Sequence, residues 1–211
     1  MNAGASCAIA IFARAPVAGQ CKSRLIPRLG ADGAARLQEW MTERSLRTAV
    51  EAGLEHIALW CAPNTEHAFF ASCAARFGVR LVAQEGADLG LRMDHAFARA
   101  GGPMLLMGTD CPSITADDLR ACAVALQNAD AAFLPAEDGG YGLVGLNAPC
   151  PEIFSNMMWS TSGVMAQTRA RLAAAGKCWR EIRTIWDVDE PEDYERLKAS
   201  GILDGARNRG T

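Results

Sequence analysis

The sequence predicts an α/β protein in which helices cover both faces of a mostly parallel, mixed sheet. Two observations support this class. Short apolar runs alternate with longer amphipathic stretches through the first two thirds of the chain, and turn residues separate them. The 211 residues are 50% hydrophobic and contain no repeat or low-complexity tract, so they can form one large core. We expect a single domain over residues 1–211, in which residues 204–211 are a polar tail.

The expected strands are short apolar runs bounded by glycine, proline or polar residues. Residues 104–107 are the clearest, because this run carries no charge and is typical of a buried parallel strand. Two later runs lie close together around an Asp-Gly turn, which predicts a small mixed or antiparallel extension. In chain order, the expected strands are residues 8–13, 57–60, 79–82, 104–107, 131–134, 141–146 and 182–185.

The expected helices lie between these strands and are recognised by their spacing and their ends. Gly53 is suited to end the first helix, and Thr65 can cap the second. Thr115 begins a pattern that resembles a capping box, and Pro191 fits a first helical turn because it loses no hydrogen bond there. The expected helices are residues 31–53, 65–77, 89–100, 115–128 and 163–175, and a last one that begins at residue 191.

Composition argues against several classes of function. Lys and Arg total 21 against 24 Asp and Glu, a net charge of −3, which disfavours a nucleic-acid partner. No apolar run approaches the about 20 residues that span a bilayer, and the N-terminus lacks the basic flank of a signal peptide. The eight cysteines form no Cys-x-x-Cys pair and have no zinc-ligand spacing, so we expect free thiols in a soluble, cytoplasmic protein.

The site is expected at the edge of the sheet where the parallel strands end, because the loops after these strands converge there. The first loop of interest, residues 14–25, holds Arg14, Gly19, Lys22, Ser23 and Arg24. Backbone amides near a glycine, together with Lys and Arg side chains, suit a polyphosphate. The loop is neither a Walker A motif nor a Gly-x-Gly-x-x-Gly fingerprint, and a solvated basic loop is the alternative interpretation.

Acidic residues follow three other strands. Asp110 comes directly after residues 104–107, where a carboxylate can hold a divalent cation against nucleotide phosphates; a turn cap is the alternative. Asp187 and Asp189 alternate along a strand end and so face the same side, which makes either a candidate second metal ligand.

The third acidic position is the turn Glu137–Asp138–Gly139–Gly140. It is either an ordinary hairpin turn or a turn whose glycines let a ligand approach the backbone closely.

Together these motifs resemble the GT-A fold of the nucleotide-diphospho-sugar transferase superfamily. Within it they resemble a bacterial family of radical-SAM/selenodomain-associated transferases, linked by name to arsenosugar biosynthesis. The loop around Lys22 also resembles that of guanylyltransferases that build deazaflavin cofactors, and the last acidic segment resembles the end of sugar cytidylyltransferases. The resemblance extends to about Leu197 and is carried by Phe12–Pro16, Gly19, Lys22–Leu25, Asp88–Gly90, Arg92, Met93, Gly108–Pro112, Pro135–Tyr141, Trp159–Thr161, Asp187–Asp189 and Pro191–Asp193.

The resemblance implies a role for each matched residue. Asp110 matches the metal-binding acid of the GT-A fold and Asp189 the second metal acid of the cytidylyltransferases, which implies Mg²⁺ or Mn²⁺. Lys22 and Arg24 match basic residues that hold phosphates. The full set assigned to the nucleotide and its phosphates is Arg14, Gly19, Lys22, Ser23, Arg24 and Arg92.

The remaining matches concern the second substrate. Asp138 and Glu137 match a family motif and are the candidate general bases. The acceptor side is assigned to Tyr141, Trp159, Ser160 and Thr161. Departures from the family pattern are modest: Ser23 replaces a frequent Thr, Cys21 lies within the phosphate loop, and Gly142 follows Tyr141 where an aromatic residue is usual.

The leading hypothesis is metal-dependent glycosyl transfer from a nucleotide sugar to a small-molecule acceptor. The first alternative is a nucleotidyltransferase that uses a nucleoside triphosphate and a phosphorylated small-molecule acceptor and releases pyrophosphate. The basic loop favours this alternative slightly, whereas the family name favours glycosyl transfer. The second alternative is a non-catalytic nucleotide-binding protein.

Overall fold

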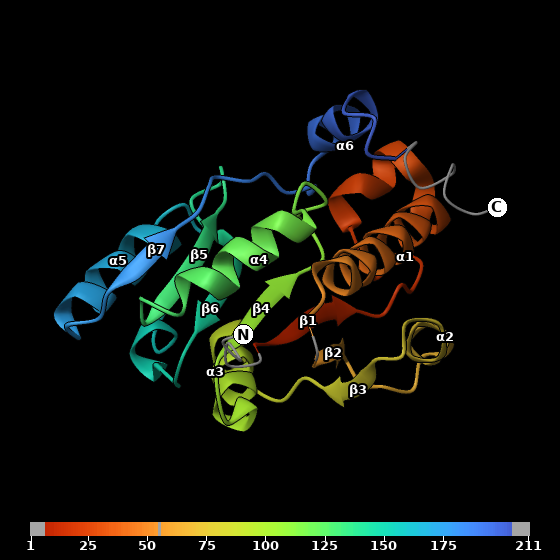
Figure 1. The fold of residues 1–211 in the computed structure, drawn as a ribbon. Coiled ribbons are helices and arrows are strands. Elements are labelled where there is room, and N and C mark those ends of the chain that lie inside the picture. The colour runs from red at the N-terminus through yellow and green to blue at the C-terminus, as the bar shows by residue number, and fades with distance from the viewer. Residues whose placement is uncertain (1–6, 55, 204–211) are drawn as a thin grey trace.

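The computed structural model describes residues 7–54 and 56–203, and a seven-stranded sheet runs through this part of the chain (Figure 1). The strands are β1 (Ala8–Arg14), β2 (Ile57–Ala62), β3 (Arg80–Ala83), β4 (Met104–Gly108), β5 (Ala131–Pro135), β6 (Tyr141–Leu146) and β7 (Trp179–Glu181). Their spatial order is β3-β2-β1-β4-β6-β5-β7. β6 is antiparallel to both neighbours, and every other pair is parallel. The predicted α/β class with a mixed extension is therefore confirmed.

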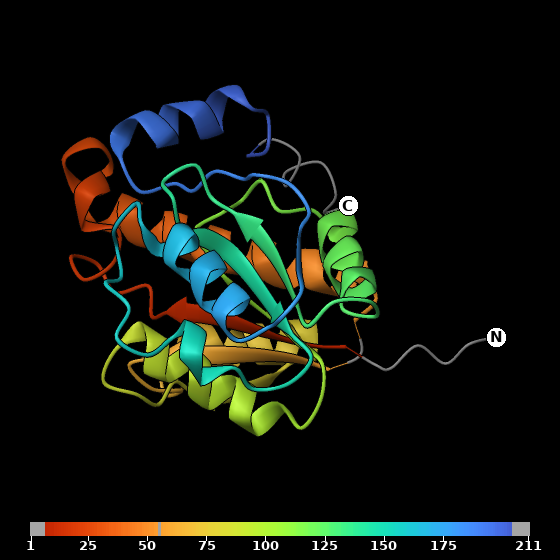
Figure 2. The same ribbon diagram turned by 90° about the vertical axis from the view of Figure 1, so that its left-hand side faces the viewer.

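Helices cover both faces of this sheet (Figures 1 and 2). They are α1 (Ile26–Ala52), α2 (Ala68–Phe77), α3 (Leu89–Ala100), α4 (Ala116–Ala125), α5 (Val164–Ala174) and α6 (Pro191–Ala199), with short 3-10 turns η1 (Ser23–Leu25) and η2 (Pro151–Ile153). Because side chains alternate along a strand, Ile9 and Ile11 of β1 pack with α1, α2 and α4. Ala10 and Phe12 of the same strand pack with α3 and α5 on the other face.

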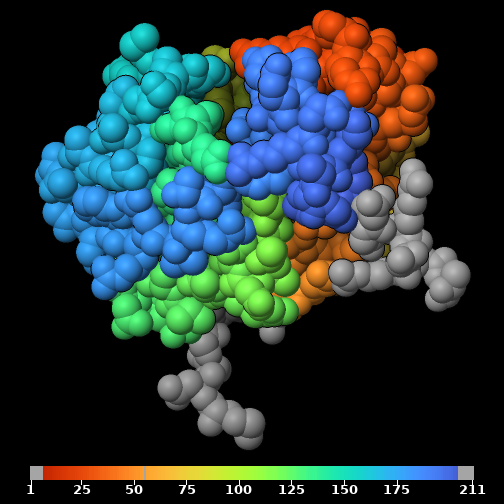
Figure 3. Space-filling model, turned by 90° about the horizontal axis from the view of Figure 1, so that it is seen from above, coloured from red at the N-terminus to blue at the C-terminus, as the bar shows by residue number. Residues whose placement is uncertain are grey.

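A third apolar cluster joins the end of the chain to its beginning. Leu25 of η1 and Met41 of α1 pack against Val188 and Leu197, all fully buried. The view from above shows the result: the C-terminal segment lies beside the N-terminal part of α1 (Figure 3). This packing brings the loop of Lys22 next to residues 187–189, which are far away in the sequence.

Three predicted boundaries were wrong. The first helix begins at Ile26 rather than residue 31, with a break at Gly30, whose φ is 72°. The second helix is capped by His67 rather than Thr65, because the His67 ring accepts a hydrogen bond from the Phe69 amide. The regular last strand covers residues 179–181 rather than 182–185, although the predicted segment stays beside β5, where Ile185 forms an isolated parallel bridge with Ala136. Between them the Arg183 side chain pairs with Asp118 of α4 at 2.6 Å.

The expectations on composition have mixed outcomes. The eight cysteines are free thiols, as predicted, and seven of them are buried. In the part of the chain that the structure describes, no helix is long and apolar enough to cross a bilayer. The predicted polar tail, residues 204–211, lies outside the described residues and stays a prediction.

Candidate active site

A cavity of about 750 Å³ opens at the edge of the sheet where the parallel strands end. The ends of β1, β2 and β4 and the segments after β3 and β5 line one part of it. The start of α3, the loop before α5 and the segment before α6 line the rest. Of the residues that the sequence assigned to the site, the structure brings together Arg14, Lys22, Ser23, Arg24, Arg92, Asp110, Asp138, Tyr141, Trp159, Ser160, Thr161 and Asp189.

Lys22 is the centre of what we call the basic end of the cavity (Arg14, Lys22, Ser23, Arg24, Asp110 and Asp189). Its Nζ lies 2.8 Å from Asp110 Oδ1 and 3.8 Å from Asp189 Oδ1, and it donates to the Val188 carbonyl at 2.7 Å. The Lys22 side chain is only 4% exposed. Its backbone has the left-handed conformation, φ 46°, just before η1. A single ammonium group thus links two segments that supply acids to the site.

The backbone reinforces this arrangement. The Val188 amide donates to the Asp110 carbonyl at 2.8 Å, so residues 187–189 are fixed beside the end of β4. Arg24 adds a second positive charge, because its Nη1 lies 2.6 Å from Asp189 Oδ2 and 3.1 Å from Glu190 Oε1. Arg24 remains 60% exposed and can turn toward a ligand.

The positions of Asp110 and Asp189 fit a divalent cation. Both carboxylates approach one positive charge, the Lys22 ammonium, and carboxylate oxygens are the ligands that Mg²⁺ and Mn²⁺ prefer. The described residues contain no cluster of three or more His, Cys, Asp or Glu side chains arranged to hold a metal. Water and phosphate oxygens would therefore complete the coordination, and the Lys22 ammonium would have to move aside.

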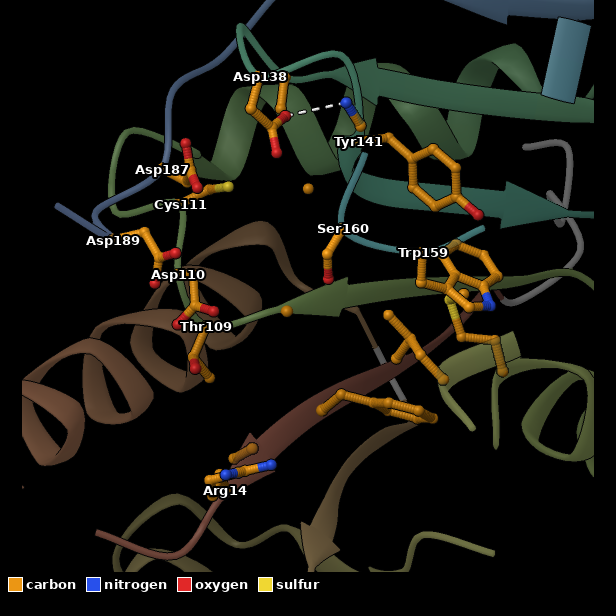
Figure 4. Close-up of a pocket in the computed structure, with 18 of the residues that line it drawn as sticks. Arg14, Thr109, Asp110, Cys111, Asp138, Tyr141, Trp159, Ser160, Asp187 and Asp189 are labelled. Atoms are coloured by element: carbon orange, nitrogen blue, oxygen red, sulfur yellow. Dashed lines mark hydrogen bonds between the residues drawn. The ribbon is translucent and has the colours of Figure 1, made fainter. Parts of the chain in front are cut away.

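Two more carboxylates, Asp138 and Asp187, line the cavity on the same side as Asp110 and Asp189 (Figure 4). The Gly140 amide donates to Asp138 Oδ1 at 2.9 Å, which orients that carboxylate. Burial, and then the nearby charge of Asp138, raises the pKa of Asp187. Burial also raises the pKa of the Cys111 thiol beside them well above its usual value, so the thiol stays protonated.

The opposite wall is the aromatic end of the cavity (Tyr141, Trp159, Ser160 and Thr161). Tyr141 and Trp159 meet edge to face with ring centres 6.5 Å apart. Trp159 packs on Gly90 of α3, where a Cβ atom would lie only 2.9 Å from the indole ring. The Tyr141 hydroxyl is buried and has no hydrogen-bond partner among the described residues, and burial raises its pKa. Figure 4 shows the aspartates on one side and these rings on the other.

Two predicted site residues do not line the cavity. Glu137 points away from it and accepts hydrogen bonds from both terminal nitrogens of Arg196, at 2.7 and 3.0 Å. These bonds lower the pKa of Glu137. Gly19, with φ 81°, forms part of the turn before Lys22. The carbonyl of Gln20, the residue after Gly19, accepts a hydrogen bond from Arg14 at 3.4 Å.

Sequence reasoning missed Gln84, which lines the cavity directly after β3. Its amide nitrogen donates to the Trp60 carbonyl at 2.8 Å and to the Ala13 carbonyl at 3.2 Å. The rule that selected the other loops could have found it, because Gln84 also follows a parallel strand. Asp187 was considered as a metal ligand, and its place in the lining follows from alternation with Asp189.

The fold and the site define an enzyme of the transferase class, with a fold like that of nucleotidyl and nucleotide-sugar transferases. The chain belongs to the family described as "Uncharacterized protein conserved in bacteria" (DUF2064), whose model matches residues 45–161.

Three known proteins illustrate this similarity. The chain is 30% identical over 186 residues to a phosphoenolpyruvate guanylyltransferase from Sphaerobacter thermophilus, covering 83% of this chain and 86% of that protein. A crystal structure from Desulfovibrio desulfuricans G20, assigned as a nucleotide-diphospho-sugar transferase, superposes with a TM-score of 0.85 at 27% identity, covering 97% and 89% of the two chains. The manganese complex of Rv0371c from Mycobacterium tuberculosis shares the fold, with a TM-score of 0.56 at 20% identity and coverage of 91% and 98%.

Proposed function

We propose that this protein transfers a nucleotidyl group from a nucleoside triphosphate to an oxygen acceptor and releases pyrophosphate. The observation that carries this proposal is the position of Lys22, buried between Asp110 and Asp189 at the wall of a cavity with further arginines. A cation so placed suits a polyphosphate chain. Similarity to a guanylyltransferase over 86% of that protein's length supports nucleotidyl rather than glycosyl transfer.

The charged residues of the basic end would bind and orient the triphosphate. Lys22 and Arg24 would place positive charge beside the phosphates, and Arg14 extends this surface toward the end of β1. A divalent cation bound by Asp110 and Asp189 would offset the charge that develops on the departing pyrophosphate. The manganese complex of a protein with the same fold supports this cofactor.

Asp138 is the general base in this proposal. It lines the cavity, its Oδ1 is oriented by the Gly140 amide, and no described residue forms an ion pair with it. An acceptor hydroxyl within hydrogen-bond reach could therefore pass its proton to Asp138 as it attacks.

Glycosyl transfer from a nucleotide sugar is the second candidate. It is favoured by the superposition on the Desulfovibrio protein, the most complete of the structural similarities described above. The resemblance to arsenosugar-associated transferases belongs to this candidate. The two reactions differ in product, since only nucleotidyl transfer from a triphosphate releases pyrophosphate.

A thermal-shift panel tests the nucleotide site. The four ribonucleoside triphosphates and UDP- and GDP-sugars are compared with and without Mn²⁺. A triphosphate at about 100 times its Kd should stabilise the protein by about 2.7 kcal/mol, and more than the matching nucleotide sugar. Pyrophosphate release with a panel of acceptors then tests the reaction. Stabilisation by nucleotide sugars alone would favour glycosyl transfer, and stabilisation by neither class would exclude both.

A further inference from the structure

The side of the cavity that carries the aspartates includes two carboxylates that have no ion pair in the described part of the chain (Figure 4). Asp110 and Asp189 at the basic end both pair with Lys22. Asp138 and Asp187 line the same cavity, yet neither forms an ion pair with a residue in the described part of the chain. A second substrate beside Asp138 therefore meets two carboxylates that no described side-chain cation pairs with, whereas the divalent cation proposed for Asp110 and Asp189 would already be shared with the phosphates of the triphosphate.

Three of the four cations among the described lining residues lie at the basic end. Among the described lining residues, Arg14, Lys22 and Arg24 belong to the segment from β1 to η1. Arg92 belongs to α3, and its Nε donates to the Gly86 carbonyl at 3.0 Å, which holds it to the loop after β3. The aromatic end itself supplies no cation among the residues that the structure describes.

The aromatic end instead offers apolar surface. Phe12, Met93, Leu106 and Val144 line the cavity together with Tyr141 and Trp159. The apolar surface continues outside, because Leu89, which also lines the cavity, is 45% exposed and Met158, next to Trp159, is 70% exposed. A binding surface of this composition recognises apolar area and offers few partners to a charged group.

We propose that the acceptor is an uncharged compound with a reacting hydroxyl group and an apolar face. This inference rests on the proposed nucleotidyl transfer. The hydroxyl lies by Asp138, and the apolar face packs against Tyr141 and Trp159. The hydroxyl oxygen forms a bond to the α-phosphorus, the bond from that phosphorus to the bridging oxygen of the β-phosphate breaks, and pyrophosphate leaves. The hydroxyl proton passes to Asp138, so atoms and charge balance.

A phosphate or carboxylate acceptor fits this position poorly. Such a group is already ionised and needs a cation more than a base, whereas Asp138 and Asp187 would repel it. The acceptor therefore differs in charge from phosphoenolpyruvate, the compound in the name of the Sphaerobacter relative. The buried Tyr141 hydroxyl has no partner among the described residues, and an oxygen atom of the acceptor could accept its hydrogen bond.

Two probes that share a phenyl ring test the charge preference. Phenyl β-D-glucopyranoside is neutral and carries hydroxyl groups, and phenyl phosphate is an anion. Their dissociation constants are measured on the full chain by ligand-observed NMR. Saturating pyrophosphate fills the phosphate-binding basic end, so that phenyl phosphate does not bind there, and nucleotide is left out so that the result does not depend on turnover. We expect the glucoside to bind at least about tenfold more tightly, which is less than a single like-charge contact at about 4 Å can cost near a protein surface.

Variants connect this preference to the residues. The double substitution Asp138→Asn and Asp187→Asn should strengthen phenyl phosphate binding about tenfold and change glucoside binding much less. Asp117→Asn, in a side chain 91% exposed on α4, is the matched control and should change neither. Trp159→Ala should weaken the glucoside and leave stabilisation by the triphosphate intact.

Several outcomes would overturn the proposal. Equal or tighter binding of phenyl phosphate contradicts it, as does the absence of glucoside binding at millimolar concentration. Loss of triphosphate stabilisation in Trp159→Ala, with glucoside binding retained, would mean that the rings hold the nucleobase instead. The nucleotide panel is a separate measurement, so failure of the acceptor class leaves the nucleotidyl transfer itself standing.

Discussion

The two ends of the cavity differ in how their polar groups are satisfied. At the basic end the protein neutralises its own charges: Lys22 pairs with Asp110 and Asp189, and Arg24 pairs with Asp189. In the rest of the cavity, Asp138 has no ion pair and the Tyr141 hydroxyl at the aromatic end has no hydrogen-bond partner among the described residues. The basic end is thus stable without a ligand, whereas the other end carries groups that only a ligand or water can satisfy.

This difference agrees with the different tasks that we propose for the two ends. Charge held in place before binding suits a ligand with a constant polyphosphate chain, because little reorganisation is needed. Polar groups without partners beside apolar walls suit a ligand that offers them hydrogen bonds. A ligand that lacks these hydrogen bonds would bind less well, so the site would be selective.

The largest effect is expected from Lys22→Met. Loss of one preorganised donor to the phosphates should lower kcat/KM with a triphosphate by about a hundredfold. The same change removes the cation between Asp110 and Asp189, so Mn²⁺ should bind more tightly. Electron paramagnetic resonance titration measures the dissociation constant of Mn²⁺. Lys198→Met, which removes an exposed ammonium on α6, is the control. Unchanged or weaker Mn²⁺ binding in Lys22→Met would show that the ammonium does not compete for this position.

The second prediction concerns the segment that carries Asp187 into the cavity. Arg183 fixes it to α4 through two hydrogen bonds to Asp118, at 2.6 and 2.7 Å. Burial alone would raise the pKa of Asp118, but the bonds from Arg183 and Thr115 more than offset it, so the pKa is lowered. Arg183→Met should therefore destabilise the fold by about 2 kcal/mol at neutral pH.

The stabilisation by the Arg183–Asp118 pair should depend on pH. A carboxyl group whose pKa is lowered by folding stabilises the protein above its ordinary pKa, and this stabilisation is lost as the pH falls through the lowered value. The difference in urea midpoint between the wild type and Arg183→Met should therefore shrink in acid. A difference that stays constant below the ordinary pKa of an aspartate would exclude the ionised pair as its cause.

Much of the fold could be predicted from the sequence, because local patterns determine it. The run at residues 104–107 has no charge and became the buried strand β4, and residues 89–100 became α3 with both ends as expected. The last strand was misplaced because Ile182 and Ile185 suggest a strand. This segment stays beside β5, where Ile185 bridges Ala136, but its regular ladder ends at Glu181 and Arg183 pairs with Asp118, which is 65 residues away in the sequence.

The site was predictable as a set of loops but not as a set of contacts. Strand ends identified Asp110 and the loop of Lys22, since loops after parallel strands meet at one edge. The burial of Lys22 between two acids depends on the packing of Leu25 against Val188 and Leu197, which no local pattern reveals. Gln84 escaped attention because a lone amide side chain carries no motif.

A smaller effect is expected from Tyr141→Phe at the aromatic end. Removing a buried hydroxyl that has no partner should leave the free protein as stable as before or stabilise it by up to about 1 kcal/mol. The same variant should weaken binding of phenyl β-D-glucopyranoside severalfold. Thermal unfolding and the NMR titration check the two effects separately. A clear loss of stability would show that water or a neighbouring group already satisfies this hydroxyl.

The smallest effect is expected from Glu137→Gln, and it separates two adjacent acids. Glu137 is about half exposed and pairs with Arg196 outside the cavity, so the loss of this surface ion pair should reduce stability by at most about 0.5 kcal/mol. Turnover, followed by pyrophosphate release, should stay within about twofold of the wild type, since Glu137 reaches neither substrate. In Asp138→Asn, by contrast, the base itself is lost and turnover should fall by two orders of magnitude or more. If both variants lose activity equally, the turn must move on binding and bring Glu137 into the cavity. Glu137 would then have to be counted among the charged groups of the cavity, and the comparison of its two ends would change.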